Sequence, residues 1–297
     1  MTSVRRGLAG LLAYVRPTFM LPAVGMALYG AALAPLPTFE WPIAALHAAT
    51  VGLALLVAHL RDGYVDGHQR GEETPRLDVG AFRWSIGIGS VAVLLLSAVL
   101  AARAGVLAGL STTVLLLLAL SHAPYLDRHP VTVTADYPVG IATALVGGYA
   151  AQTAGVESVV ALTALLFVGF LSGVKIGIDR LDRAFDASIG KRTVPVVLGT
   201  RGAERAAVAV FLFTASATAA LGVAGYVELL PVRPLYALVA ALAPLAGLVA
   251  TVALRAEWVV RVQMASSYVF AVGLFAAVCS GGCVGSEIAH GALEALL

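Results

Sequence analysis

Long apolar segments alternate with short polar ones along most of the chain. Each apolar segment is close to the roughly 20 residues that a helix needs to cross a bilayer. The segments expected to span are 18–36, 42–60, 83–102, 105–123, 138–155, 158–178, 203–226, 234–254 and 263–286. The pattern predicts an all-α protein, a multi-pass membrane helical bundle of about nine transmembrane helices around a central cavity, forming one domain over residues 1–297.

Composition agrees with an integral membrane protein. Hydrophobic residues make up 60% of the chain and charged residues 12%, whereas a soluble domain carries about 25% charged residues. The net charge of +2 gives no indication of a nucleic-acid partner, and none is expected. Residues 1–14 are expected to form a short interfacial helix, because Arg16 and Pro17 interrupt the apolar run before it reaches a spanning length.

The basic residues predict the orientation. If the N-terminus lies in the cytoplasm, only Arg103 and Arg233 of the 19 Lys and Arg residues fall on the outer side. Cytoplasmic loops of membrane proteins are enriched in Lys and Arg. We therefore expect a multi-pass protein of the cell membrane, with the N-terminus and both long acidic loops in the cytoplasm.

One of these loops begins with a stripe of acids at the end of a long apolar segment. Asp179, Asp182 and Asp186 fall within about 60° of one another on a helix, and Lys175 lies in the same stripe. The C-terminal end of a helix dipole is negative, so three carboxylates there indicate a bound cation. A solvated charged loop between two membrane helices is the alternative.

A small cationic turn follows the stripe, with the sequence Gly190-Lys191-Arg192-Thr193. Two cations beside a glycine suit the binding of a phosphate group. The turn and the stripe together favour a site for a metal ion and a phosphate over a solvated loop.

A second acidic loop follows an earlier span. Asp62 and Asp66 are four residues apart, and Glu73 returns to their face if the helix continues. Three glycines, Gly63, Gly67 and Gly71, weigh against continuation. The Asp62/Asp66 spacing recurs at Asp182/Asp186, after another even-numbered span. This indicates a weak internal repeat that presents carboxylates to one cavity from two sides, although chance can also produce the spacing.

Three further features have simpler interpretations. His122, Tyr125 and His129 fall in a third cytoplasmic loop and can line the cavity mouth, but the histidines are expected to be surface residues rather than metal ligands. Cys279 and Cys283 are expected to be small packing residues. The spacing of Gly169, Gly173 and Gly177 predicts close helix packing, with a groove for a lipid chain as the alternative.

Two carboxylate clusters that face each other across a membrane cavity suit a hard divalent cation. Mg²⁺ prefers oxygen ligands and is usually shared with the phosphates of a substrate. Basic residues near the acids would balance the remaining phosphate charge, and the apolar spans would hold a hydrocarbon tail. These features together describe an isoprenyl diphosphate as the substrate.

The chain resembles the UbiA-type intramembrane prenyltransferases over nearly its whole length. Residues 182–199, D-R-A-F-D-A-S-I-G-K-R-T-V-P-V-V-L-G, are similar to the family's D-x-x-x-D-x-x-x-G-K-x-T-L-P-V-x-L-G. The family's N-D-x-x-D pattern is altered here, with Asp62 at the Asn position and Gly63 at the first Asp position. Arg70 stands where some branches have Asp. Residues 122–128, H-A-P-Y-L-D-R, are similar to Y-S-x-x-L-K-R, with Asp127 in place of Lys.

The resemblance implies an enzyme that transfers an isoprenyl group from a polyprenyl diphosphate to a hydrophobic acceptor, with Mg²⁺ assisting diphosphate release. The acceptor is a quinone precursor, a carotenoid or a lipid; the archaeal ether-lipid branch is not favoured, because residues 73–77 match its N-x-P-x-R-P pattern only in part. The expected catalytic residues are Asp62, Asp66, Asp182 and Asp186. The expected metal ligands are Asp62, Asp66, Glu73, Asp179, Asp182 and Asp186. The expected diphosphate-binding residues are Tyr64, Arg70, Arg76, Arg128, Lys175, Lys191 and Arg192. A membrane transporter and an inactive isoprenoid-diphosphate-binding relic of the fold are the alternatives.

Overall fold

The computed structural model describes residues 2–279 and 282–287, and within them the chain is helical, with no β-strand. The all-α expectation is confirmed. The chain divides into two compact units, which are described separately below. Unit 1 consists of Met1–Ala31, Glu40–Asp127 and Thr143–Gly155, and unit 2 consists of Ala32–Phe39, Arg128–Ala142 and Val156–Leu297.

Within the described residues, seven helical segments are long and apolar enough to cross a bilayer. They are Trp41–Arg70, Val79–Ala104, Val106–Arg128, Ser158–Ser188, Val194–Tyr226, Pro234–Ala253 and Glu257–Val278. The segment expected at 18–36 is a shorter apolar helix, Pro17–Ala32, and the one at 138–155 lies in Pro130–Thr153. The last expected span, 263–286, runs through residues 280–281, outside the described residues. A multi-pass helical bundle is therefore supported, and the count of nine stays a prediction.

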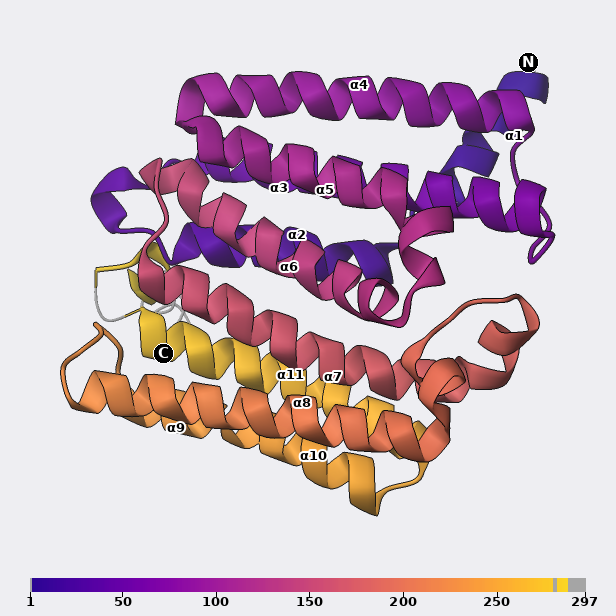
Figure 1. The fold of residues 1–297 in the computed structure, drawn as a ribbon. Coiled ribbons are helices and arrows are strands. Elements are labelled where there is room, and N and C mark those ends of the chain that lie inside the picture. The colour runs from indigo at the N-terminus through magenta and orange to yellow at the C-terminus, as the bar shows by residue number, and fades with distance from the viewer. Residues whose placement is uncertain (1, 280–281, 288–297) are drawn as a thin grey trace, which may run out of the picture. The chain divides into compact units, whose positions relative to one another are not determined.

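Unit 1 is a group of packed helices. Its elements are α1 (Thr2–Leu12), α2 (Pro17–Ala32), α3 (Trp41–Tyr64), α4 (Val79–Ala104), α5 (Val106–Tyr125) and the second half of α6 (Pro130–Thr153). α4 and α5 form an antiparallel hairpin (Figure 1). Gly105 makes the one-residue turn between them with a φ of 105°, which a residue with a side chain rarely adopts. α2 and α6 approach closely, because Gly30 faces the Leu145 carbonyl and Gly148 faces the Ala27 carbonyl.

α4 exposes a stripe of large apolar side chains. Trp84, Ile88, Val91 and Leu95 recur at helical spacing and are each more than half exposed. A soluble protein rarely exposes so large an apolar face. The stripe is the surface expected for contact with lipid tails.

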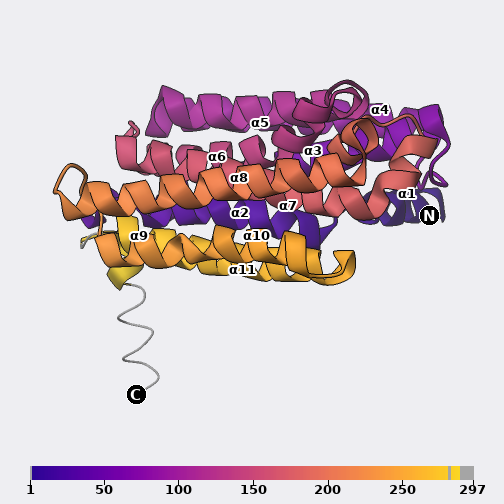
Figure 2. The same cartoon turned by 60° about the horizontal axis from the view of Figure 1, so that its bottom comes forward.

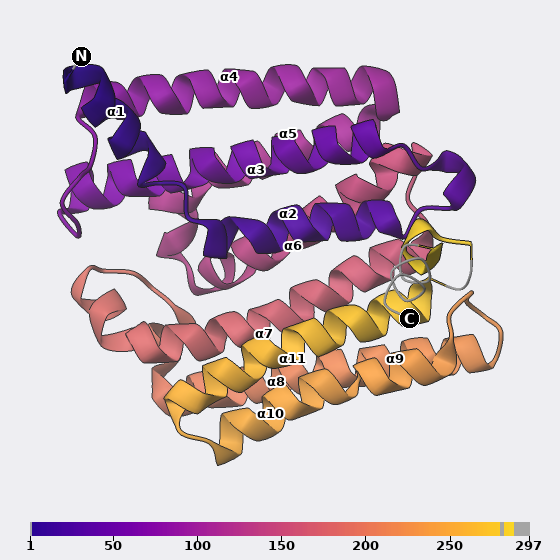
Figure 3. The ribbon, with the colours of Figure 1, turned by 180° about the vertical axis from the view of Figure 1, so that it is seen from behind.

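Unit 2 holds the longest helices. Its elements include α7 (Ser158–Ser188), α8 (Val194–Tyr226), α9 (Pro234–Ala240), α10 (Leu242–Ala253) and α11 (Ala256–Val278). α7 and α8 lie next to each other (Figure 2), and α9 and α10 follow one another alongside α11 (Figure 3). Between α7 and α11 the ring of Phe270 stacks on that of Phe170 and meets that of Phe167 edge to face.

The glycine stripe of α7 is a packing surface. Gly169 faces Thr214 and Gly173 faces the ring of Phe211, both on α8, while Gly177 faces Gln263 on α11. A Cβ at any of the three glycines would lie closer than van der Waals contact to these side chains. The expectation of close helix packing is confirmed, and within unit 2 the stripe faces protein side chains.

The cysteines differ from expectation. Cys279 and Cys283 are joined by a disulfide, with their Cα atoms 5.7 Å apart. The interpretation as two separate packing thiols is wrong, because the two sulfur atoms are bonded to each other.

Candidate functional site

The acidic stripe of unit 2 lies on the last turns of α7, as the sequence predicts. α7 continues without interruption to Ser188, so Asp179, Asp182 and Asp186 share one face. Asp179 is buried and pairs with Lys175 one turn earlier. The Oδ2 atom of Asp179 is also buried and has no hydrogen-bond partner. Asp182 is exposed.

The turn after α7 folds back onto Asp186. The backbone N–H of Lys191 donates to the Asp186 carbonyl at 2.9 Å, and the Thr193 hydroxyl donates to Asp186 Oδ2 at 3.2 Å. Gly190 adopts a φ of 76°, which allows this reversal. The turn therefore places Lys191 and Arg192 within a few residues of a carboxylate held in a fixed position.

Two arginines of α7 fasten this turn to α8. Arg183 Nε donates to the Pro195 carbonyl at 2.9 Å, and Arg180 Nη2 lies 3.5 Å from Glu204 Oε2. The Nε and Nη1 atoms of Arg180 are buried without hydrogen-bond partners. Both arginines hold the start of α8 against the acidic end of α7, a role that the sequence does not reveal.

The first acidic loop is more helical than its glycines suggest. α3 ends at Tyr64 and continues as the π-helical segment η2 (Val65–Arg70). The helix ends where Gly71 adopts a left-handed conformation with a φ of 69°, and the N–H groups of Gly71 and Glu72 both donate to the Asp66 carbonyl. Single π-turns occur often at functional sites, because they redirect the side chains that follow.

The glycines inside this helical end are required by packing. A Cβ on Gly63 would collide with the ring of Tyr14, and a Cβ on Gly67 would lie 2.9 Å from the Cβ of Pro75. Tyr14 is itself buried, and its hydroxyl accepts a hydrogen bond from the Arg76 N–H at 3.2 Å. The chain therefore needs glycine at residues 63 and 67 so that the segments before and after the helix can pack on it.

Arg70 lies among carboxylates. Its Nη2 atom donates to Asp127 Oδ2 at 2.6 Å, and its Nη1 atom lies 3.5 Å from Asp66 Oδ1 and 3.6 Å from Glu72 Oε1. Glu72 rather than Glu73 thus joins this cluster. Neither Glu72 nor Asp127 was among the expected site residues, although the reversed charge of residue 127 relative to the family pattern was a usable signal.

The other expected residues of the first loop point to different partners. Glu73 is exposed and pairs with Arg16 at 3.7 Å. The Tyr64 hydroxyl accepts a long hydrogen bond of 3.5 Å from Arg83. The side chain of Arg76 is exposed, and its backbone holds Tyr14.

The basic side chains of the third predicted cytoplasmic loop, residues 122–129, are partly or fully exposed. Arg128 and His129 are both exposed, and His129 Nδ1 accepts from the Val131 N–H at 3.3 Å. His122 is half-buried and, like His129, joins no cluster of metal-binding side chains in the described part of the chain. The expectation that neither histidine is a metal ligand stays a prediction.

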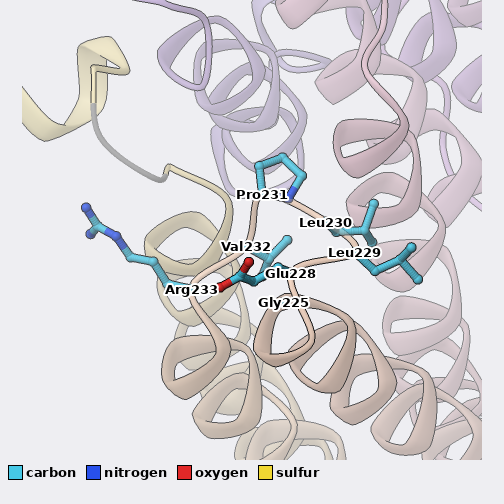
Figure 4. A pocket seen from close by; sticks show the side chains of 7 residues that line it. All are labelled: Gly225, Glu228, Leu229, Leu230, Pro231, Val232 and Arg233. Carbon is cyan, nitrogen blue, oxygen red and sulfur yellow. The ribbon is translucent and has the colours of Figure 1, made fainter.

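Among residues 2–279 and 282–287, no three His, Cys, Asp or Glu side chains are placed so that they could hold a metal ion by themselves. An open hollow of about 450 Å³ lies at the α8–α9 loop, around Glu228 and Arg233 (Figure 4). The hollow lies at the C-terminal end of α8, whereas the acidic turn precedes its N-terminal end. A helix of this length extends about 50 Å. The hollow is therefore not part of the acidic site.

Comparison with known proteins supports the fold. No protein-family model and no curated protein matches the sequence. The structure is similar to a digeranylgeranylglyceryl phosphate synthase, with a TM-score of 0.69 at 14% identity, covering 93% of this chain and 99% of the other. It is similar to a UbiA homologue from Archaeoglobus fulgidus bound to DMAPP and Mg²⁺, with a TM-score of 0.69 at 13% identity, covering 91% and 99%.

A third similar structure is the apo form of a UbiA homologue from Aeropyrum pernix K1. Its TM-score is 0.63 at 19% identity, covering 88% of this chain and 98% of the other. The likeness extends over nearly the full length of every chain compared, in spite of the low identity. The chain therefore has the fold of the UbiA homologues of known structure.

Proposed function

We propose that the chain is an intramembrane prenyltransferase that transfers an isoprenyl group from a polyprenyl diphosphate to a hydrophobic acceptor. One observation carries the proposal: the Asp179–Asp182–Asp186 stripe ends in a turn that sets Lys191 and Arg192 beside a held carboxylate. Carboxylates for a cation and cations for a phosphate are thus adjacent in one unit. The similar fold of a UbiA homologue bound to DMAPP and Mg²⁺ supports the same substrate class.

The donor set of α7 fits Mg²⁺. Mg²⁺ binds carboxylate oxygens and usually keeps waters or substrate phosphates as its other ligands, so a closed protein cage is not needed. Asp179 offers a buried oxygen without a hydrogen-bond partner, and Asp182 and Asp186 lie on the same face. These three residues would hold the ion together with the diphosphate, and Asp62, Asp66 and Glu73 are the proposed ligands from the first loop.

The reaction breaks the bond between the allylic carbon and the diphosphate oxygen, with both electrons leaving on the oxygen. Bound Mg²⁺ would neutralise charge on the departing diphosphate. Lys191 and Arg192 would hold its outer oxygens, as would Lys175 and Arg128. The acceptor then forms a bond to the allylic carbon and releases a proton. The apolar helices would keep water away from the allylic carbon, so that water does not react there in place of the acceptor.

The finer features of the proposal follow from the sequence. We place the protein in the cell membrane with about nine spans, the N-terminus and both acidic loops in the cytoplasm, and the prenyl chain among the helices. Tyr64 and Arg76 are proposed to lie near the diphosphate. The acceptor is a quinone precursor, a carotenoid or a lipid.

Diphosphate release from purified protein tests this function. With geranylgeranyl diphosphate, Mg²⁺ and a lipid extract as the acceptor source, the wild type should release diphosphate and form a prenylated product. Asp182→Asn should lower the rate of release by about 100-fold or more, while Glu228→Gln, which neutralises an exposed acid at the opposite end of α8, should leave it unchanged. Equal rates in the wild type and Asp182→Asn would overturn the proposal. Tight binding of the diphosphate without turnover would instead favour an inactive relic of the fold.

A further inference from the structure

Three carboxylates converge on one guanidinium in unit 1. Asp66, Glu72 and Asp127 each have an oxygen within 3.6 Å of an Arg70 nitrogen, and the contact to Asp127 is a hydrogen bond of 2.6 Å. The Arg70 side chain is 19% exposed and the Asp127 side chain 2% exposed. The Asp66 side chain is 26% exposed, so the cluster is partly buried, and its charges are screened less than those of a fully solvated pair.

The backbone explains why these groups meet. The π-turn of Val65–Arg70 and the left-handed Gly71 bring residue 72 back towards residue 70. The 3₁₀ turn after α5 (Leu126–Arg128) buries Asp127 from a separate part of unit 1. Asp127 Oδ1 and Arg70 Nη1 are both buried without a hydrogen-bond partner. The hydrogen bond from Arg70 Nη2 to Asp127 Oδ2 compensates the burial of the Asp127 carboxylate.

The two ends of this salt bridge are also two positions at which the sequence departs from the family pattern. Arg70 stands where some branches of the family have Asp, and Asp127 stands where the family pattern has Lys. Both residues carry a charge opposite to that of the pattern, and in this chain they pair with each other.

We propose that Arg70 is a positioning residue, a built-in cation that holds Asp66, Glu72 and Asp127 around itself. In the described part of the chain these three carboxylates are not placed to hold an ion while Arg70 is present, and removal of Arg70 would let them close on a divalent ion. Arg70 therefore organises the first loop and does not bind the diphosphate, which departs from the expectation for this residue. The inference deepens the proposed function at the first loop but is tested without any diphosphate or turnover.

Removal of the guanidinium should create a divalent-cation site. Purified Arg70→Ala in EDTA should melt roughly 6 to 12 °C below the wild type, because one partner of a buried pair is lost. Mn²⁺ should recover most of this loss and bind to one more site per chain than in the wild type, as counted by electron paramagnetic resonance. The wild type should show no comparable stabilisation by Mn²⁺ alone.

Three variants separate this explanation from a general loss of packing. Arg70→Ala/Asp127→Asn should lose the added Mn²⁺ site, because one of its three carboxylates is gone. Arg70→Lys keeps a positive charge and should fold without gaining a Mn²⁺ response. Arg16→Ala removes the exposed pair with Glu73 in the same loop and should also gain no site.

Equal Mn²⁺ binding by the wild type and Arg70→Ala would overturn the proposal. So would failure of Arg70→Ala to fold in Mn²⁺ while Arg70→Lys folds, because the carboxylates would then have accepted no ion. Loss of prenyl transfer in every preparation would contradict the proposed function and leave these binding results unchanged.

Discussion

The ring of Tyr14 occupies the space into which a side chain at residue 63 would project, since a Cβ on Gly63 would lie 2.8 Å from Tyr14 Cζ. Gly63 is the position at which the family pattern has an acid. Here the segment that follows α1 packs there instead, with the Tyr14 carbonyl accepting from His59 Nδ1 at 3.2 Å. The end of α3 therefore has a packing contact at residue 63.

Gly63→Ala should destabilise the protein. The added methyl group would displace the buried Tyr14 ring, and overpacking of this kind costs about 1–3 kcal/mol. Thermal unfolding in detergent measures the effect. Gly87→Ala in α4 is the matched control, because its Cβ would meet nothing within 4 Å, and it should be neutral or stabilising by up to about 1 kcal/mol. Equal melting temperatures for Gly63→Ala and the wild type would show that Tyr14 moves aside freely.

Much of the fold can be predicted from the sequence, because helices that contact lipid require long runs of apolar residues. Apolar runs of spanning length predict helices, and the segments at 83–102 and 105–123 match α4 and α5 within a few residues. The remaining errors come from packing. The disulfide between Cys279 and Cys283, which follows α11, was not predicted from the sequence.

The site was predictable where chemistry depends on local spacing. Asp179, Asp182 and Asp186 share a helical face, as their spacing requires. The Arg70 cluster was not predictable, because Asp127 comes from a turn 57 residues away. Likewise, Glu72 rather than Glu73 contacts Arg70 because the chain forms a π-turn before it, and hydrophobic periodicity does not predict a π-turn.

Thr193→Val should weaken the turn between α7 and α8. The substitution keeps the side-chain shape but removes the hydroxyl that donates to the buried Asp186 carboxylate. Hydrogen bonds to charged groups contribute about 1.5–3 kcal/mol, so a loss of about 2 kcal/mol in unfolding free energy is expected, together with slower diphosphate release. Thr193→Ser should retain both properties. Thr200→Val, at an exposed position, should stay within about 0.5 kcal/mol of the wild type.

Lys175→Met should destabilise unit 2 through Asp179. Asp179 is buried on α7 and pairs with Lys175, so removal of the lysine leaves a carboxylate without its cation at a cost of about 3–5 kcal/mol. Lys175→Met/Asp179→Asn should recover much of this loss, because it removes the uncompensated charge. Glu204→Gln breaks the more exposed pair with Arg180 and should cost less than about 1 kcal/mol. If the double variant is as unstable as the sum of the singles, the pair has no energetic coupling.

Asp66→Asn and Asp182→Asn should not act independently if both acids serve one diphosphate. Each substitution is expected to lower the rate of diphosphate release by about 100-fold or more, the usual cost of removing one electrostatic contact to a reacting group. Residues that act as one catalytic unit give non-additive losses. The double variant should therefore retain far more activity than the product of the two single losses allows. Asp182→Asn/Glu228→Gln is the matched pair, since Glu228 lies in the loop after α8 and its neutralisation should add nothing. Losses that multiply in the Asp66→Asn/Asp182→Asn variant would place the two acids in separate roles and exclude a shared substrate group.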